Sequence, residues 1–142
     1  MLLVDARGVP LSIIVTAANH HDVTQLAATL DAIVAPRPPL APRACQHLCA
    51  DAGFVGATAD RTMRDHDYTP HVRPRGEERA QRAHGKRARR WVVEVAHSWF
   101  TRFRKLLVRF EKMHRSYLAL NMLAAAIIAL RHVPAKINII YG

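Results

Sequence analysis

Gln46–Phe54 reads QHLCADAGF, a short and mostly apolar run that ends in an acidic residue followed by a glycine. The run predicts a β-strand over residues 46–50, and Gly53 permits a turn directly after it. Asp51 would then stand at the carboxyl tip of a strand. An aspartate in that position usually forms a turn or caps a helix, so the rest of the chain must decide whether it does more.

The residues before this strand predict a hairpin and a helix. Leu2–Val4 and Leu11–Ala17 are rich in β-forming residues and are separated by a Gly/Pro turn. Asp22 is expected to cap a helix that extends to about Val34, because apolar residues recur there at helical spacing.

His20, His21 and Asp22 form a short polar group that has two interpretations. They could bind a metal or act as general bases. Adjacent side chains on one element diverge, however, and an aspartate at a helix start is more often a cap. The structural role is therefore favoured.

The residues after the strand predict a crossover and a basic loop. Val55–Asp65 has the pattern of a short helix, and Thr69–Arg73 that of a strand. Residues 74–90 are polar, basic and without periodicity, which indicates a loop or a disordered segment.

Residues 91–131 predict the C-terminal helices. Apolar residues recur from Trp91 to Phe110 on one face, which predicts one long helix, and a last helix is expected over about Ser116–Arg131. Trp91, Trp99 and Phe103 could stack on bases, but their helical spacing favours a place in the core. The order β-β-α-β-α-β-α-α predicts an α/β chain with helices covering a mixed sheet.

The charge of the chain indicates a polyanionic partner. The 142 residues, half of them apolar, suffice for a core, and the formal net charge is +10. Most basic residues lie in Arg73–Arg90 and Arg102–Arg115, so nucleic acid is the leading candidate for the C-terminal half. Tyr117–Leu130 is too short for a membrane span, and Met1 opens no signal peptide, which predicts a cytoplasmic protein.

The two cysteines fit a reducing compartment. Cys45 and Cys49 stand four residues apart with His47 between them, too close for a disulfide framework. They could be zinc ligands if two more ligands came from elsewhere, but buried small residues are the favoured interpretation.

Glu94 is a second carboxylate of interest, because it stands in a dense basic stretch. Phosphoryl transfer on DNA can use two divalent metal ions held by carboxylates that converge from different elements. A carboxylate in such a stretch can hold a metal while neighbouring guanidinium groups hold phosphates. Asp51 at a strand end and Glu94 near a helix start have that form.

Three collinear blocks carry a resemblance to a known family. Arg90–Glu94 (RWVVE), followed by Ser98–Phe100 (SWF) and Arg102–Leu106 (RFRKL), resembles the segment around the catalytic glutamate of DDE transposases of bacterial insertion sequences. The resemblance is to group five, within the group-four-like superfamily. Cys49–Phe54 (CADAGF) is similar to the block around their second catalytic aspartate.

The third block lies at the start of the chain. Leu2–Asp5, with Gly8, Pro10 and Thr16–Asp22 (TAANHHD), resembles the stretch between the family's first and second catalytic aspartates. The similarity covers nearly the whole chain. In the family the first aspartate lies upstream of this block, and Asp5 matches a turn residue, so Asp5 is not expected to bind metal.

The resemblance implies an RNase-H-like fold and a divalent metal, Mg²⁺ or Mn²⁺, in DNA cleavage and strand transfer at insertion-sequence ends. Asp51 would be the second metal ligand and Glu94 the third. Residues 1–142 would form a partial catalytic domain that lacks the first, central strand, so the inner edges of the two sheet halves would be unpaired.

The resemblance also implies DNA contacts by a group of basic side chains. Arg90 matches the family's arginine one turn before the glutamate. A family tyrosine is replaced by Arg87, and a later basic position falls on Thr101, beside Arg102. The residues expected on DNA are Arg87, Arg89, Arg90, Arg102 and Lys105.

Two functions from different classes follow. The first is a transposase catalytic domain at the bacterial nucleoid that acts on transposon ends and target DNA once an N-terminal part, or self-association, completes it. The second is a catalytically inactive remnant that only binds DNA or full-length transposase.

Overall fold

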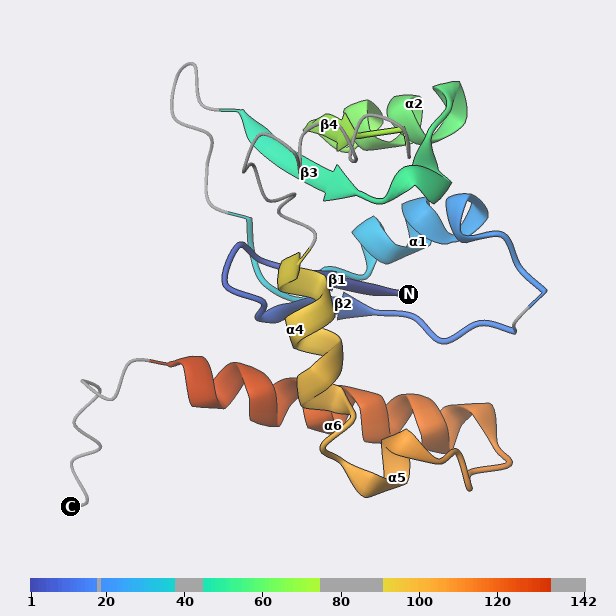
Figure 1. Ribbon diagram of the computed structural model, residues 1–142, viewed down its shortest axis with the longest axis vertical. Coiled ribbons are helices and arrows are strands. Elements are labelled where there is room, and N and C mark those ends of the chain that lie inside the picture. Colours follow the sequence, from blue (N-terminus) through green and yellow to red (C-terminus); the bar gives the residue numbers. More distant parts are fainter. Residues whose placement is uncertain (18, 38–44, 75–90, 134–142) are drawn as a thin grey trace.

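The computed structural model of the protein describes residues 1–17, 19–37, 45–74 and 91–133 (Figure 1). It begins with the predicted hairpin, in which β1 (Leu2–Val4) pairs antiparallel with β2 (Pro10–Ile13). The Asp5 carboxylate shapes the turn, because its Oδ1 accepts hydrogen bonds from the backbone amides of Arg7 and Val9, both at 2.8 Å. The structural role expected for Asp5 is confirmed.

The helix that follows is shorter than predicted. It opens as a 3₁₀ turn, η1 (Asp22–Gln25), and continues as α1 (Leu26–Asp31). The capping role predicted for Asp22 is wrong, since Asp22 lies inside the first turn. The N-cap residue is His21, and the His21 side chain makes no capping hydrogen bond. The helix does not reach Val34, because the Val34 amide donates instead to the Leu11 carbonyl of the hairpin, at 3.1 Å.

A parallel strand pair forms the second part of the fold. β3 (Gln46–Ala50) has the predicted bounds and pairs with β4 (Tyr68–Val72). The crossover between them is η2 (Ala52–Phe54) followed by α2 (Ala57–Asp65). The predicted helix and second strand are therefore confirmed to within two residues.

The C-terminal helices differ from the prediction at one point. α4 (Trp91–Phe100) is followed by the single turn α5 (Arg104–Leu107) and by α6 (His114–His132). The predicted helix through Phe110 is wrong, because Phe103 takes an extended backbone and α4 ends before it. This break lets Phe103 and Leu106 pack beside α6, while Phe110 is 76% exposed.

The hairpin lies between two hydrophobic clusters. Leu3 faces the first cluster, which contains Leu26, Leu30, Leu48, Ala59 and Met63. Leu2 and Ile13 face the second, which contains Phe100, Ala124 and Ile128. The alternation of side chains along a strand sends neighbouring residues to opposite faces, so one short hairpin contributes to both cores.

The described strands form two separate two-stranded sheets. Within the part of the chain that is described, β1 pairs with β2, and β3 pairs with β4. The α/β composition is as predicted, but a single mixed sheet is absent there: the antiparallel pair and the parallel pair stay separate.

Candidate functional site

Asp51 directly follows β3 and is exposed. Its backbone is extended, and its Oδ1 accepts a hydrogen bond of 2.8 Å from the Gly53 amide, so the carboxylate caps η2. A Cβ added to Gly53 would lie 3.0 Å from the same oxygen, so a side chain at this position would crowd the capping carboxylate. The second carboxylate oxygen is not engaged in this turn.

Glu94 lies in the first turn of α4 and is also exposed. A carboxylate near a helix N-terminus is favoured by the helix dipole, so the position of Glu94 suits its negative charge. α4 packs against β1 and α6, whereas β3 packs against β4. The two candidate ligands thus belong to different packing units of the fold.

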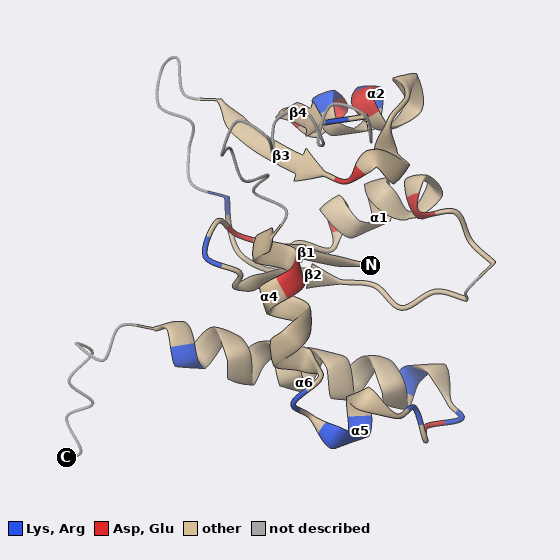
Figure 2. Ribbon diagram, in the orientation of Figure 1, with Lys and Arg blue, Asp and Glu red and all other residues tan. Residues whose placement is uncertain are grey.

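The described residues do not gather a complete metal site. Among them, no group of three or more His, Cys, Asp or Glu side chains is placed to hold one ion. Figure 2 shows the acidic residues spread over several elements. Asp51 and Glu94 are hard oxygen donors of the kind that Mg²⁺ and Mn²⁺ take, so their chemistry fits a divalent metal although their arrangement is incomplete.

The basic residues gather beside the C-terminal helices. In Figure 2 the Lys and Arg segments cluster around α5 and the start of α6. Arg102 and Lys105, the described members of the group expected to contact DNA, are exposed there. Arg87, Arg89 and Arg90 lie outside the described residues, together with most of the predicted 74–90 loop.

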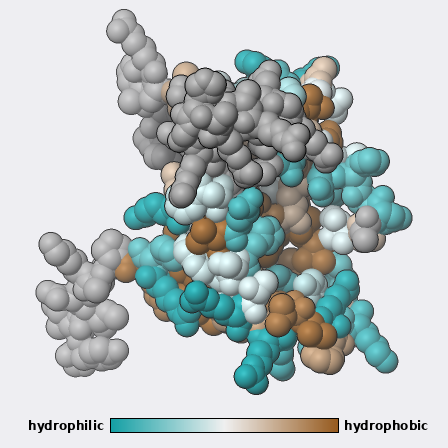
Figure 3. Space-filling view, in the orientation of Figure 1, coloured by the Kyte–Doolittle hydropathy of each residue, from teal (hydrophilic) through white to brown (hydrophobic). Residues whose placement is uncertain are grey.

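An apolar patch adjoins these basic residues, and Figure 3 shows it in the region of α5. Its side chains are 51–76% exposed and belong to Leu107, Val108, Phe110 and Met113. Of the aromatic residues expected in the core, Trp99 and Phe103 pack against the second cluster. Trp91 does not, because it is 52% exposed.

A cavity of about 330 Å³ lies where the hairpin meets α4 and α6. Its lining includes Met1, Ile14, His97, Tyr117 and Asn121, and neither Asp51 nor Glu94. Burial is the main reason why the pKa of His97 is lowered from its usual value. The cavity is therefore separate from the candidate carboxylates.

The comparisons with known proteins identify the family. The model of the transposase DDE domain matches residues 48–131, a stretch that contains both Asp51 and Glu94. The chain belongs to this transposase family. It is also 37% identical, over 128 residues, to the putative transposase for insertion sequence element IS402 of Burkholderia cepacia.

The match to that transposase covers 84% of this chain and 58% of the relative, so the chain spans a little over half of the relative's length. A comparison with solved structures gives no match. In the described part of the chain, no helix is long and apolar enough to cross a membrane.

One group of side chains was not found from the sequence. His47 and His71 are 24 residues apart, yet their rings are in contact. The two rings meet because of the register between β3 and β4. The connecting residues 55–67 do not determine that register, so it could not be predicted from the sequence. The alternation of the two predicted strands was the one available signal.

Proposed function

We propose that this chain is the C-terminal part of an RNase-H-like DDE transposase catalytic domain, spanning residues 1–142 and acting on DNA at the bacterial nucleoid. Asp51 and Glu94 would hold a divalent metal, Mg²⁺ or Mn²⁺. The observation that carries the proposal is the position of both carboxylates inside the transposase DDE domain match, one at a strand tip and the other in the first turn of a helix.

Among the described residues, the outer edges of β1 and β3 pair with no other strand, which supports a further strand between them. β1 pairs with β2 along one edge and β3 pairs with β4 along one edge, within the described residues. Leu3 of β1 and Leu48 of β3 pack in the same cluster, so the two strands already share a core. An open sheet edge leaves backbone groups without ladder partners, and an added strand would satisfy both edges.

That strand would carry the third carboxylate, provided by an N-terminal transposase part or through self-association. A strand placed between β1 and β3 would draw the unit holding Asp51 toward the unit holding Glu94. The divalent metal would then activate an attacking oxygen and stabilise the leaving oxygen of a DNA phosphodiester. The role of this chain's residues is to hold the metal and to fix the position of the phosphate.

The basic residues around α5 would bind the DNA backbone. Arg102 and Lys105 are exposed on that side, and Arg87, Arg89 and Arg90 precede α4 in the sequence. Contacts of this kind are independent of base sequence and weaken as salt rises. They suit transposon ends and target DNA alike.

The test is reconstitution of cleavage. The chain is mixed with DNA that carries insertion-sequence ends and Mg²⁺, alone and with the N-terminal part of the IS402-type relative. We expect cleavage only in the mixture, and its loss in Asp51→Asn and Glu94→Gln. DNA binding without cleavage in the mixture would instead support the inactive remnant, and cleavage by the chain alone would show that two carboxylates suffice.

A further inference from the structure

The exposed face of the β3–β4 sheet carries histidine and cysteine side chains, residue types that can bind metals, away from the two carboxylates. His47 Nδ1 lies 2.6 Å from His71 Nε2, and the ring centroids are 4.7 Å apart. Both histidines are exposed. Two imidazoles that direct nitrogen atoms at each other share one proton between two lone pairs, and a metal ion can take the place of that proton.

The strand register adds a thiol to this pair. Cys49 lies two residues after His47, so both side chains point to the same face of β3. Cys49 is also the direct partner of His71 across the parallel pair, and its thiol is exposed and free. Directly paired residues have Cβ atoms about 5 Å apart, which is within reach of a common ion.

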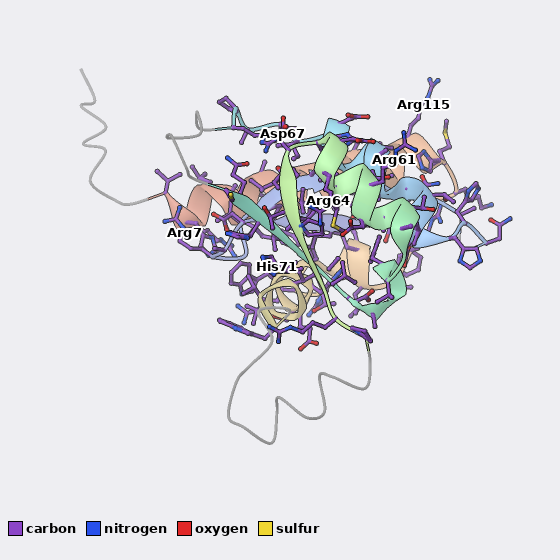
Figure 4. The ribbon with its side chains drawn as sticks, turned by 90° about the horizontal axis from the view of Figure 1, so that it is seen from above. Arg7, Arg61, Arg64, Asp67, His71 and Arg115 are labelled. Atoms are coloured by element: carbon purple, nitrogen blue, oxygen red, sulfur yellow. The ribbon has the colours of Figure 1, made fainter. Side chains whose placement is uncertain are left out.

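The opposite face of the sheet is used for packing. Leu48, Tyr68 and Val72 belong to the first hydrophobic cluster, together with α2. Figure 4 shows His71 beside β4 and away from α2. The His and Cys side chains therefore make no contribution to the core that would account for them.

We propose that His47, His71 and Cys49 form a binding site for a borderline-soft transition metal ion, with Zn²⁺ as the best fit. Zinc takes imidazole and thiolate ligands in a tetrahedral arrangement, and a water can fill the fourth position. The side chains as placed do not yet surround one ion. Nitrogen atoms at about 2.1 Å from zinc stand about 3.4 Å apart, so the exposed rings separate slightly and the Cys49 thiol rotates inward.

The same strand geometry excludes Cys45 from the site. Cys45 precedes β3 and has no partner in its register with β4, and four residues separate it from Cys49, which is about 13 Å of extended chain. Two sulfur atoms on one zinc ion lie within about 4 Å of each other. Cys45 is exposed and free like Cys49, and so it is a matched control.

The experiment is a titration of the reduced full chain with Co²⁺, followed by displacement with Zn²⁺ and with Mg²⁺. We expect the absorption of a tetrahedral Co²⁺–thiolate centre, displaced by Zn²⁺ and not by Mg²⁺. His47→Ala, His71→Ala and Cys49→Ser should each weaken binding by at least about tenfold, since even outer partners of metal ligands contribute that much. Cys45→Ser should bind as the unchanged chain does.

Two results would overturn the site. One is a Cys45→Ser variant that loses as much affinity as Cys49→Ser. The other is unchanged binding in the double variant His47→Ala with His71→Ala. Circular dichroism of each variant verifies the fold, and where an alanine variant is unfolded the glutamine variant is titrated in its place. None of these results depends on transposase activity, so the site and the proposed function succeed or fail separately.

Discussion

The Asp51 carboxylate caps η2, because its Oδ1 accepts a hydrogen bond of 2.8 Å from the Gly53 amide. One carboxylate therefore has a structural role in addition to the role proposed for it at a metal. The two roles can be separated, because an asparagine oxygen still accepts the amide hydrogen but carries no charge.

We expect Asp51→Asn to leave the free energy of unfolding nearly unchanged and Asp51→Ala to lower it by about 1 kcal/mol, the usual cost of a lost cap. Both should abolish cleavage in the reconstituted mixture. Urea denaturation and the cleavage assay measure the two effects. Full activity of Asp51→Asn would remove this residue from the metal site.

Met63 is completely buried in the first cluster. Met63→Ala should lower the free energy of unfolding by about 2–5 kcal/mol, because the truncation leaves a cavity that α2 and β4 fill only in part. Met122 is 51% exposed and serves as the control, since Met122→Ala should change stability by no more than about 0.5 kcal/mol. Equal effects in the two variants, measured by chemical denaturation, would contradict this core.

Gly8 combines a φ of +87° with close contact to α4. A Cβ at this position would lie 3.2 Å from the Trp99 ring, so Gly8→Ala should destabilise through both backbone strain and crowding, by about 1–3 kcal/mol. Gly56 is the control for backbone strain alone, because its φ is +145° and a Cβ there would meet no neighbouring atom. Thermal unfolding should show a larger loss for Gly8→Ala than for Gly56→Ala.

His66 joins α2 to α1 and makes stability depend on pH. Its Nδ1 lies 2.7 Å from the Thr62 carbonyl and its Nε2 lies 3.1 Å from Asp31. The hydrogen bond to Thr62 is the largest reason why the pKa of His66 is raised above 6.5, with Asp31 adding to it against the effect of burial. The stabilisation is full below about pH 6.5 and is lost as the pH rises through the folded-state pKa.

The variant His66→Gln should therefore be less stable than the unchanged chain at pH 5.5, with a smaller difference at pH 8.5. The quantity compared is the difference in stability between the variant and the unchanged chain at each pH. This difference cancels the effect of His97, whose lowered pKa changes stability with pH in the opposite direction in both chains. Denaturation midpoints at the two pH values measure it. A difference that grows with pH would refute the ion pair.

The basic residues around α5 predict salt-dependent DNA binding. Neutralising Arg102 and Lys105 should reduce the slope of log affinity against log salt by about 2, if each contacts one phosphate. Neutralising Arg87, Arg89 and Arg90 should flatten it further. Arg61 on α2 is the control, because it lies on another element and pairs with Asp65 at 3.7 Å. A slope that changes equally with Arg61→Ala would indicate a diffuse charge effect.

The sequence predicted local elements better than their connections. β3 has the predicted bounds because an apolar run bounded by turn residues is a local signal. The break after α4 was missed because Phe103 and Leu106 keep helical spacing, and only packing against α6 makes the chain turn. The end of α1 was missed for a similar reason, since the competing Leu11 carbonyl lies on a distant segment.

For the candidate site too, local features could be predicted from the sequence and the arrangement in space could not. Asp51 and Glu94 were found through short motifs, which need no tertiary information. Their distance from each other depends on how the two sheets are joined, and no residue pattern gives that. The contact of His47 with His71 depends on strand register alone and was equally out of reach.

Leu2 and Leu3 are adjacent, yet each serves a different hydrophobic cluster. The hairpin therefore connects the two clusters. If either cluster opened, one face of the hairpin would be exposed to solvent. A strand added along β1 would extend the sheet that connects the two clusters. Assembly of the transposase would then stabilise both clusters at once. An unassembled chain would therefore be cleaved by proteases more readily than an assembled one.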